Sequence, residues 1–313
     1  MSTPLSKHLA TRFYDRTKDS NDVSPAASSS RVQPESIRPE LLGLPHRPAE
    51  APPESIALVH FAKNLGRGLK KWHIGKNWKP FLDVHEQARL NVFCKGFDPR
   101  SRNVTPFLEP VPLATMQEWL DSVEPWQRRG FGSGRGELTE WHNARALCSN
   151  LAGYLSSGET TATEGISDMT MWERRLFHMN MMGARTRRLS FDIDYILDYT
   201  DTAFPHVGAI LHQTGRLVDG ELGAAELLSI CQLTVMRALA PLYYKHTVIP
   251  VTLVSLADCD ARILLVYFDL QSGQTRVYKS PISTFDKPGG FRRDDWKLLL
   301  CWLLATPRFP KVQ

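Results

Sequence analysis

Three runs near the C-terminal end of the chain decide the fold: VIPVTLVSL (residues 248–256), ARILLVYFD (261–269) and QTRVYKS (274–280). The first two are apolar and rich in β-branched residues, and the third alternates, as strands do. Residues 291–305 follow with apolar side chains at helical spacing, and Asp294 suits the start of that helix. We therefore predict a three-strand antiparallel meander closed by a C-terminal helix, over about 246–307. Strand 263–268 is apolar on both faces, which indicates a central strand.

Upstream of the meander, the spacing of apolar residues favours helices. We expect them over residues 56–69, 116–124, 138–155, 171–182, 191–200 and 222–244. The clearest apolar stripe lies in 138–155 and consists of Trp141, Ala144, Leu147, Cys148 and Leu151. The predicted fold class is α+β. A mostly helical N-terminal two-thirds, about 54–245, packs on the small meander within a single domain of residues 54–313.

Residues 1–53 form a segment of different composition. They hold eight of the 21 prolines and a run of three serines, with few apolar residues. Such a segment buries too little apolar surface to offset the entropy of ordering it. We expect a disordered tail and favour a spacer, with a regulatory or docking segment as the alternative.

The composition of the chain is that of a folded globular protein. The chain is 42% hydrophobic and 23% charged, with a net charge of +5, so it can form a sizeable core. No stretch approaches the length of a membrane span, and no signal peptide is visible, so we expect the cytoplasm or the nucleus. The cysteines are too far apart for a zinc knuckle, which favours reduced thiols. These cysteines are Cys94, Cys148, Cys231, Cys259 and Cys301.

Acidic residues gather in the stretch FDIDYILDYTD, residues 191–201. A D-x-D pair, Asp192 and Asp194, can hold Mg²⁺ or Mn²⁺ with a diphosphate, which would suit a phosphoryl- or glycosyl-transfer enzyme. Alternatively, Asp194, Asp198 and Asp201 follow helical spacing and form the solvated face of a helix over 191–200. We favour the helix face and predict no cofactor, with Mg²⁺ or Mn²⁺ as the alternative.

A basic segment interleaved with aromatics precedes these acids. Such a pattern can neutralise phosphates and stack on bases. It can equally pair with the acidic region 191–230, which holds seven acids and one arginine. We favour the pairing, because no nucleic-acid-binding module surrounds the segment. Its members are Lys63, Arg67, Lys70, Lys71, Trp72, Lys76, Trp78 and Lys79.

The order helix–strand–strand–strand–helix in the last third resembles the core of restriction-endonuclease-like nucleases. Those enzymes hold Mg²⁺ with an acid on one strand and a [DE]-x-K pattern on the next. The resemblance implies Asp269 as the strand acid, Glu226 as the helix acid and Lys279 as the lysine. However, Val277 stands where the second acid is required. This departure leaves a degenerate nuclease as an alternative rather than our main reading.

A second resemblance covers residues 246–307, through HTVIPV (246–251), ARIL (261–264), Ser280-Pro281 and LATP (304–307). This part is similar to a family of uncharacterised proteins of filamentous fungi, and the resemblance implies no activity. An accessory role in fungal specialised metabolism is one alternative. Because no complete catalytic motif is found, we expect a non-enzymatic interaction or regulatory protein. Its partner is expected to be a protein, with nucleic acid as the alternative through residues 63–79.

Overall fold

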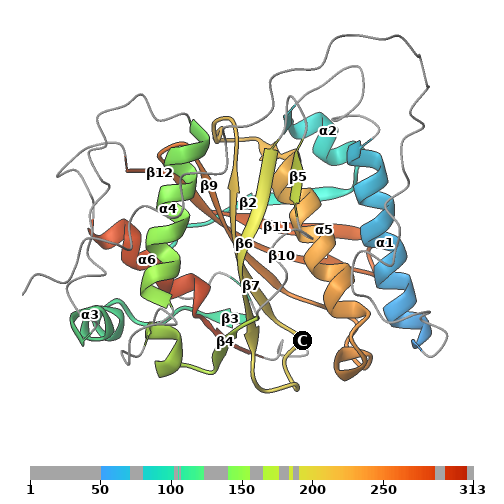
Figure 1. Ribbon diagram of the computed structural model, residues 1–313. Helices are drawn as coiled ribbons and strands as arrows, with labels where there is room; N and C mark the ends of the chain where they lie inside the picture. The colour runs from blue at the N-terminus through green and yellow to red at the C-terminus, as the bar shows by residue number, and fades with distance from the viewer. Residues whose placement is uncertain are drawn as a thin grey trace, which may run out of the picture. The chain divides into compact units, whose positions relative to one another are not determined.

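A large mixed sheet organises the chain in the computed structural model (Figure 1). The sheet has nine strands. Its main path runs β2-β11-β10-β9-β7-β6-β4, with β12 paired to β10 and β5 to β6. The β7–β9 and β11–β2 pairs are parallel, and the other neighbours are antiparallel. The strands are β2 (Val92–Gly96), β4 (Trp172–Arg174), β5 (Gly183–Arg185), β6 (Ser190–Tyr199), β7 (Val207–Gln213), β9 (Val251–Ala257), β10 (Asp260–Asp269), β11 (Gln274–Lys279) and β12 (Ser283–Thr284).

The structure describes residues 51–70, 80–101, 105, 107–122, 140–155, 165–175, 183–185, 190–285 and 293–308. The tail predicted for 1–53 lies outside them except for its last three residues. Two short antiparallel ladders join distant segments: β1 (Phe81–Leu82) with β8 (Leu222–Gly223), and β3 (Leu108–Glu109) with β13 (Thr306–Pro307). The helices are α1 (Pro53–Leu69), α2 (Val84–Arg89), α3 (Leu113–Ser122), α4 (Glu140–Leu155), α5 (Ala224–Ala238) and α6 (Arg293–Leu303), with 3-10 turns η4 (Ile166–Met169) and η5 (Pro241–Tyr243).

Helices cover both faces of the sheet, which gives three layers (Figure 1). On the side that we call the α5 face, α1 and α5 pack against one apolar cluster; on the α4 face, α3, α4 and α6 pack against another. Strand β10 contributes side chains to both clusters, because successive residues of a strand point to opposite faces. Leu264 and Val266 face α5, whereas Ile263 and Leu265 face α4. This confirms the prediction of a central strand at 263–268.

The predicted fold class was wrong in the size of its sheet. The meander of β9, β10 and β11 exists, and α6 follows it, but these strands belong to a large mixed sheet that also draws strands from the N-terminal two-thirds. The clearest omission is β7, VGAILHQ, in which every residue is buried. A short run buried on both faces has no alternation, so its periodicity cannot separate strand from buried helix.

The helix predicted over 191–200 is strand β6. A bulge explains the error, because the register with β7 shifts between Ile193 and Tyr195 and leaves Asp194 as the extra residue. The shift breaks the period of two. The buried residues Ile193, Ile196 and Leu197 therefore follow the i, i+3, i+4 spacing of a helix.

Two other helix predictions need correction. In the segment 171–182, the described residues form strand β4 at its start, and 176–182 lie outside the description. The long helix predicted over 222–244 is shorter: β8 precedes it, α5 ends at Ala238, and the 3-10 turn η5 follows. By contrast, the stripe predicted on α4 is buried at Ala144, Leu147, Cys148 and Leu151, as expected.

Candidate functional site

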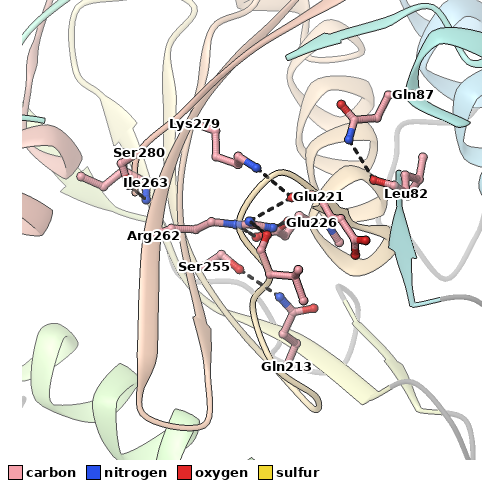
Figure 2. Close-up of polar contacts among 12 residues, drawn as sticks. Leu82, Gln87, Gln213, Glu221, Glu226, Ser255, Arg262, Ile263, Lys279 and Ser280 are labelled. Carbon is pink, nitrogen blue, oxygen red and sulfur yellow. Dashed lines mark hydrogen bonds and ion pairs between the residues drawn. The ribbon is translucent and has the colours of Figure 1, made fainter. Parts of the chain in front are cut away.

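A buried polar network lies at the N-terminal end of α5, on the α5 face of the sheet (Figure 2). Its centre is Arg262 of β10, which is fully buried. The guanidinium Nε donates to Glu226 Oε1 at 2.8 Å, and Nη2 pairs with the other oxygen of that carboxylate. Nη1 donates to the carbonyls of Val218 and Glu221, both at 3.0 Å. The arginine therefore ties the loop before α5 to the sheet.

Glu226 is the helix acid of the nuclease resemblance, and both oxygens of its carboxylate already have partners in this network. Besides the arginine contacts, its Oε2 accepts the backbone N–H of Gly223 at 2.7 Å and so caps α5. Lys279 lies in the same network, where Nζ donates to the carbonyl of Glu221 at 3.0 Å. Burial lowers the pKa of Lys279, and the charge of Arg262 lowers it further. The carboxylate already neutralises a guanidinium, which suits a structural role better than holding Mg²⁺.

Asp269 lies away from this network. It ends β10, seven residues beyond Arg262, which is about 23 Å along a strand. Its carboxylate accepts from the backbone N–H groups of Gln271 and Ser272 and from the Ser272 hydroxyl, closing the β10–β11 turn. These bonds lower the pKa of Asp269. The structure thus brings Glu226 and Lys279 together but leaves Asp269 apart. No strand among the described residues carries [DE]-x-K.

The D-x-D pair lies on strand β6. Asp192 stands opposite His212 of β7 in the register. Asp194 is the bulged residue two positions after Asp192. Asp194 Oδ2 lies 2.8 Å from His212 Nδ1. Farther along β6, Asp198 pairs with Arg237 at 2.8 Å. Of the two acids, the structure therefore places Asp194 beside a histidine that the sequence reasoning had not selected.

The basic segment is described only in part. Lys63 and Arg67 lie exposed on α1, Lys70 is the exposed residue at its C-cap, and Arg67 donates to Asn64. The other members, Lys71, Trp72, Lys76, Trp78 and Lys79, lie outside the described residues. In the acidic region 191–230, Asp198 forms described ion pairs with Arg175 and Arg237, and Glu226 forms one with Arg262. Pairing of segment 63–79 with that region therefore stays a prediction.

Strand β2 presents an edge of the sheet. It pairs with β11 on one side, and no described strand pairs with its other side. The backbone carbonyl of Asn91 accepts from the N–H of Thr275, and the N–H of Phe97 donates to the carbonyl of Lys279. The backbone groups of the odd-numbered residues therefore point toward β11. In a parallel ladder the backbone groups alternate in direction, which turns those of Val92, Cys94 and Gly96 toward the open side.

An aromatic and basic strip adjoins this edge on the α4 face; we call it the edge strip. The register aligns Phe93, Arg276 and Tyr267 in one row across β2, β11 and β10, and Lys95 with Tyr278 in the next row. Phe93 is 60% exposed, although it is a large aromatic. The Arg276 guanidinium lies over the Phe93 ring, 5.4 Å from its centroid. Burial, followed by the neighbouring Tyr278 hydroxyl, raises the pKa of Tyr267 to about 12.

Sequence reasoning did not select Arg262, Phe93 or His212. For Arg262 a signal existed: a cation inside an otherwise apolar strand, buried on both sides, requires a buried acid as partner. For Phe93 no signal existed, because its exposure depends on β2 lying at the sheet edge.

No known protein family, curated protein or solved structure matches this chain in our comparisons. None of the described helices combines the length and apolar character that crossing a membrane requires. The candidate sites therefore rest on geometry alone.

Proposed function

We propose that this is a non-enzymatic interaction protein that binds an extended segment of a partner protein along the open edge of β2. The observation that carries the proposal is Phe93, an aromatic side chain 60% exposed on an edge strand. Natural sheets usually cover or blunt such edges, because unpaired backbone groups attract a further strand. None of the described strands pairs with this edge of β2, and peptide-binding sheets add the partner as a further strand at such an edge.

The edge strip specifies the chemistry of the partner. Phe93, Tyr267 and Tyr278 offer aromatic surface, and Arg276 and Lys95 offer positive charge on the same face. Aromatic and arginine side chains dominate the binding energy of protein interfaces. We therefore expect the bound segment to carry a large apolar side chain against Phe93 and an acidic side chain near Arg276.

The network around Arg262 supports a non-enzymatic reading. Its acid and its cations are bound to one another and to backbone carbonyls. These side chains thereby hold the loop before α5 in place rather than facing a substrate.

The test is photo-crosslinking at the strip, followed by quantitative binding. A photoreactive phenylalanine analogue at position 93 would capture the bound segment, which mass spectrometry identifies. A synthetic peptide of that sequence is then titrated against the wild type and Phe93→Asp by fluorescence anisotropy. Leu242→Asp is the matched control, because Leu242 is 66% exposed and lies on η5.

We expect Phe93→Asp to weaken peptide binding by about 30-fold or more, the effect of losing a hot-spot side chain of roughly 2 kcal/mol. Leu242→Asp should leave the affinity unchanged. Equal affinity of the wild type and Phe93→Asp would refute the proposal. Capture of nucleic acid instead of peptide, with affinity falling steeply in salt, would favour the nucleic-acid alternative.

A further inference from the structure

Three potential metal ligands converge on the α4 face of the sheet, apart from the edge strip. They are Cys148 of α4, Asp194 of β6 and His212 of β7. One ligand atom from each lies within 4.8 Å of the other two. A thiol, a carboxylate and an imidazole are thus gathered from one helix and two strands that are distant in sequence.

The fold explains why these side chains meet. His212 alternates with Leu211 and so points to the α4 face, where Ile210 also lies. The bulge in β6 adds Asp194 next to Tyr195, which packs on that same face. Bulges re-aim side chains in this way and are frequent beside functional sites. Cys148 belongs to the buried stripe of α4, the helix that packs on β7 and β9.

His212 is an incompletely satisfied buried group. It is 1% exposed, its Nδ1 lies 2.8 Å from Asp194 Oδ2, and its Nε2 has no hydrogen-bond partner among the residues that the structure describes. The Trp141 ring lies against the imidazole, with the ring centroids 4.2 Å apart. Buried polar atoms in folded proteins nearly always have a partner, and an exception calls for one that the protein itself does not supply.

A nucleophilic cysteine is the competing explanation of this cluster, and the geometry disfavours it. Cys148 is 2% exposed, so a substrate has little access to its sulfur. Burial raises the pKa of the Cys148 thiol well above its usual range, and the charge of Asp194 and a hydrogen bond to it raise the pKa further. Reactive cysteines need the opposite environment, a cationic one that stabilises the thiolate.

We propose that Cys148, Asp194 and His212 bind a transition-metal ion of the Zn²⁺ class. Zinc accepts thiolate, imidazole and carboxylate ligands at about 2.0–2.3 Å in a tetrahedral arrangement. Ligand atoms within 4.8 Å of one another can reach one such ion with small side-chain movements. On binding, the Cys148 thiol loses its proton to solvent and the sulfur becomes the metal ligand.

A water molecule would fill the fourth coordination position of the metal ion. Asp194 is the exposed member of the set, with 31% of its side chain accessible, so solvent reaches the site from its side. Mg²⁺ and Mn²⁺ suit the cluster less well, because they prefer oxygen ligands to thiolate. The bound ion would join α4 to the β6–β7 pair.

The test uses the full chain, stripped with a chelator and checked for folding by circular dichroism. Zn²⁺ is titrated against a chromophoric competitor, and Co²⁺ serves as the spectroscopic probe, because a Co²⁺–thiolate bond gives a charge-transfer absorption. The variants are Cys148→Ser and Asp194→Asn. Matched controls are Cys231→Ser, a buried cysteine on the α5 face, and Asp201→Asn, an exposed acid in the turn after β6.

We expect one Zn²⁺ per wild-type chain, and loss of the Co²⁺–thiolate absorption in Cys148→Ser only. Changes beyond the direct ligands typically weaken metal binding 10–100-fold, so removing a direct ligand should cost about 100-fold or more. Both controls should bind as the wild type does. Wild-type protein without the Co²⁺–thiolate absorption would overturn the proposal, even if a variant failed to fold. Wild-type affinity in both folded variants would overturn it too.

Discussion

Replacing Arg262 with methionine should destabilise the protein far more than removing any surface cation. The variant keeps an apolar stem of similar length but deletes the guanidinium. Within the described part of the chain, it leaves the fully buried Glu226 carboxylate with only the backbone N–H of Gly223 as a hydrogen-bond partner. The carbonyls of Val218 and Glu221 also lose a donor.

The magnitude follows from the buried charge. Removing one partner of a buried ion pair costs about 3–5 kcal/mol, because the remaining charge stays desolvated. At roughly 2–4 °C per kcal/mol for a domain of this size, the melting temperature should fall by about 10 °C. Urea denaturation followed by tryptophan fluorescence measures the free energy of unfolding directly.

A second variant separates charge from packing. The double variant Arg262→Met, Glu226→Gln removes both members of the ion pair, so the buried carboxylate is gone and the protein should be more stable than Arg262→Met alone. Arg100→Met is the control, because Arg100 is exposed and pairs with Asp295 at 3.3 Å, a contact worth about 0–1 kcal/mol. A loss below about 1 kcal/mol in Arg262→Met would refute the reasoning, since it would mean that water reaches the carboxylate.

Three further predictions concern stability. Burial lowers the pKa of His206 from its usual 6.5 to about 3. Between these two pH values the histidine is neutral in the folded protein but protonated in the unfolded chain. The free energy of unfolding is therefore highest above pH 6.5 and should fall by about 1.4 kcal/mol per pH unit as the pH drops from 6.5 toward 3. His206→Asn should flatten that dependence in denaturation curves at pH 7, 6 and 5, and an unchanged slope would assign it to other groups. Leu265→Asp should abolish soluble expression, because this central-strand side chain is 2% exposed; a soluble variant with normal melting would contradict the burial. Deleting residues 1–50 should leave the melting temperature within about 5 °C of the full chain, and a larger drop would show that the tail packs on the core.

The C-terminal third was predictable because its strands are consecutive in sequence. The runs 248–256, 261–269 and 274–280 pair with their sequence neighbours, so local patterns suffice to predict the meander. The rest of the sheet depends on distant pairing: β2 adds to β11 across more than 180 residues, and β7 pairs with β9 across the whole of α5. No local pattern encodes which strand lies beside another.

The candidate sites were predictable to a smaller degree. Sequence reasoning selected Glu226, Lys279 and Asp194, and each of them makes polar contacts at a site that we describe. Their partners were missed because the sheet brings them from other segments. Arg262 stands 36 residues from Glu226, and His212 stands 64 residues from Cys148. A single residue can indicate a kind of chemistry, but a site also requires knowing which strands and helices lie side by side.

One bulged residue connects the largest error in the fold prediction with the proposed metal site. In a regular strand with no bulge, Ile193, Tyr195 and Leu197 would share a face, and the sequence would alternate visibly. The bulge at Asp194 instead sends Ile193 and Tyr195 to opposite clusters, which imitates a helix in the sequence. The same irregularity places a carboxylate against His212 beside the apolar cluster of the α4 face. A break in periodicity at a polar residue is therefore more informative here than the regular pattern around it, because a fold retains such a local disruption mainly where the side chain has a task.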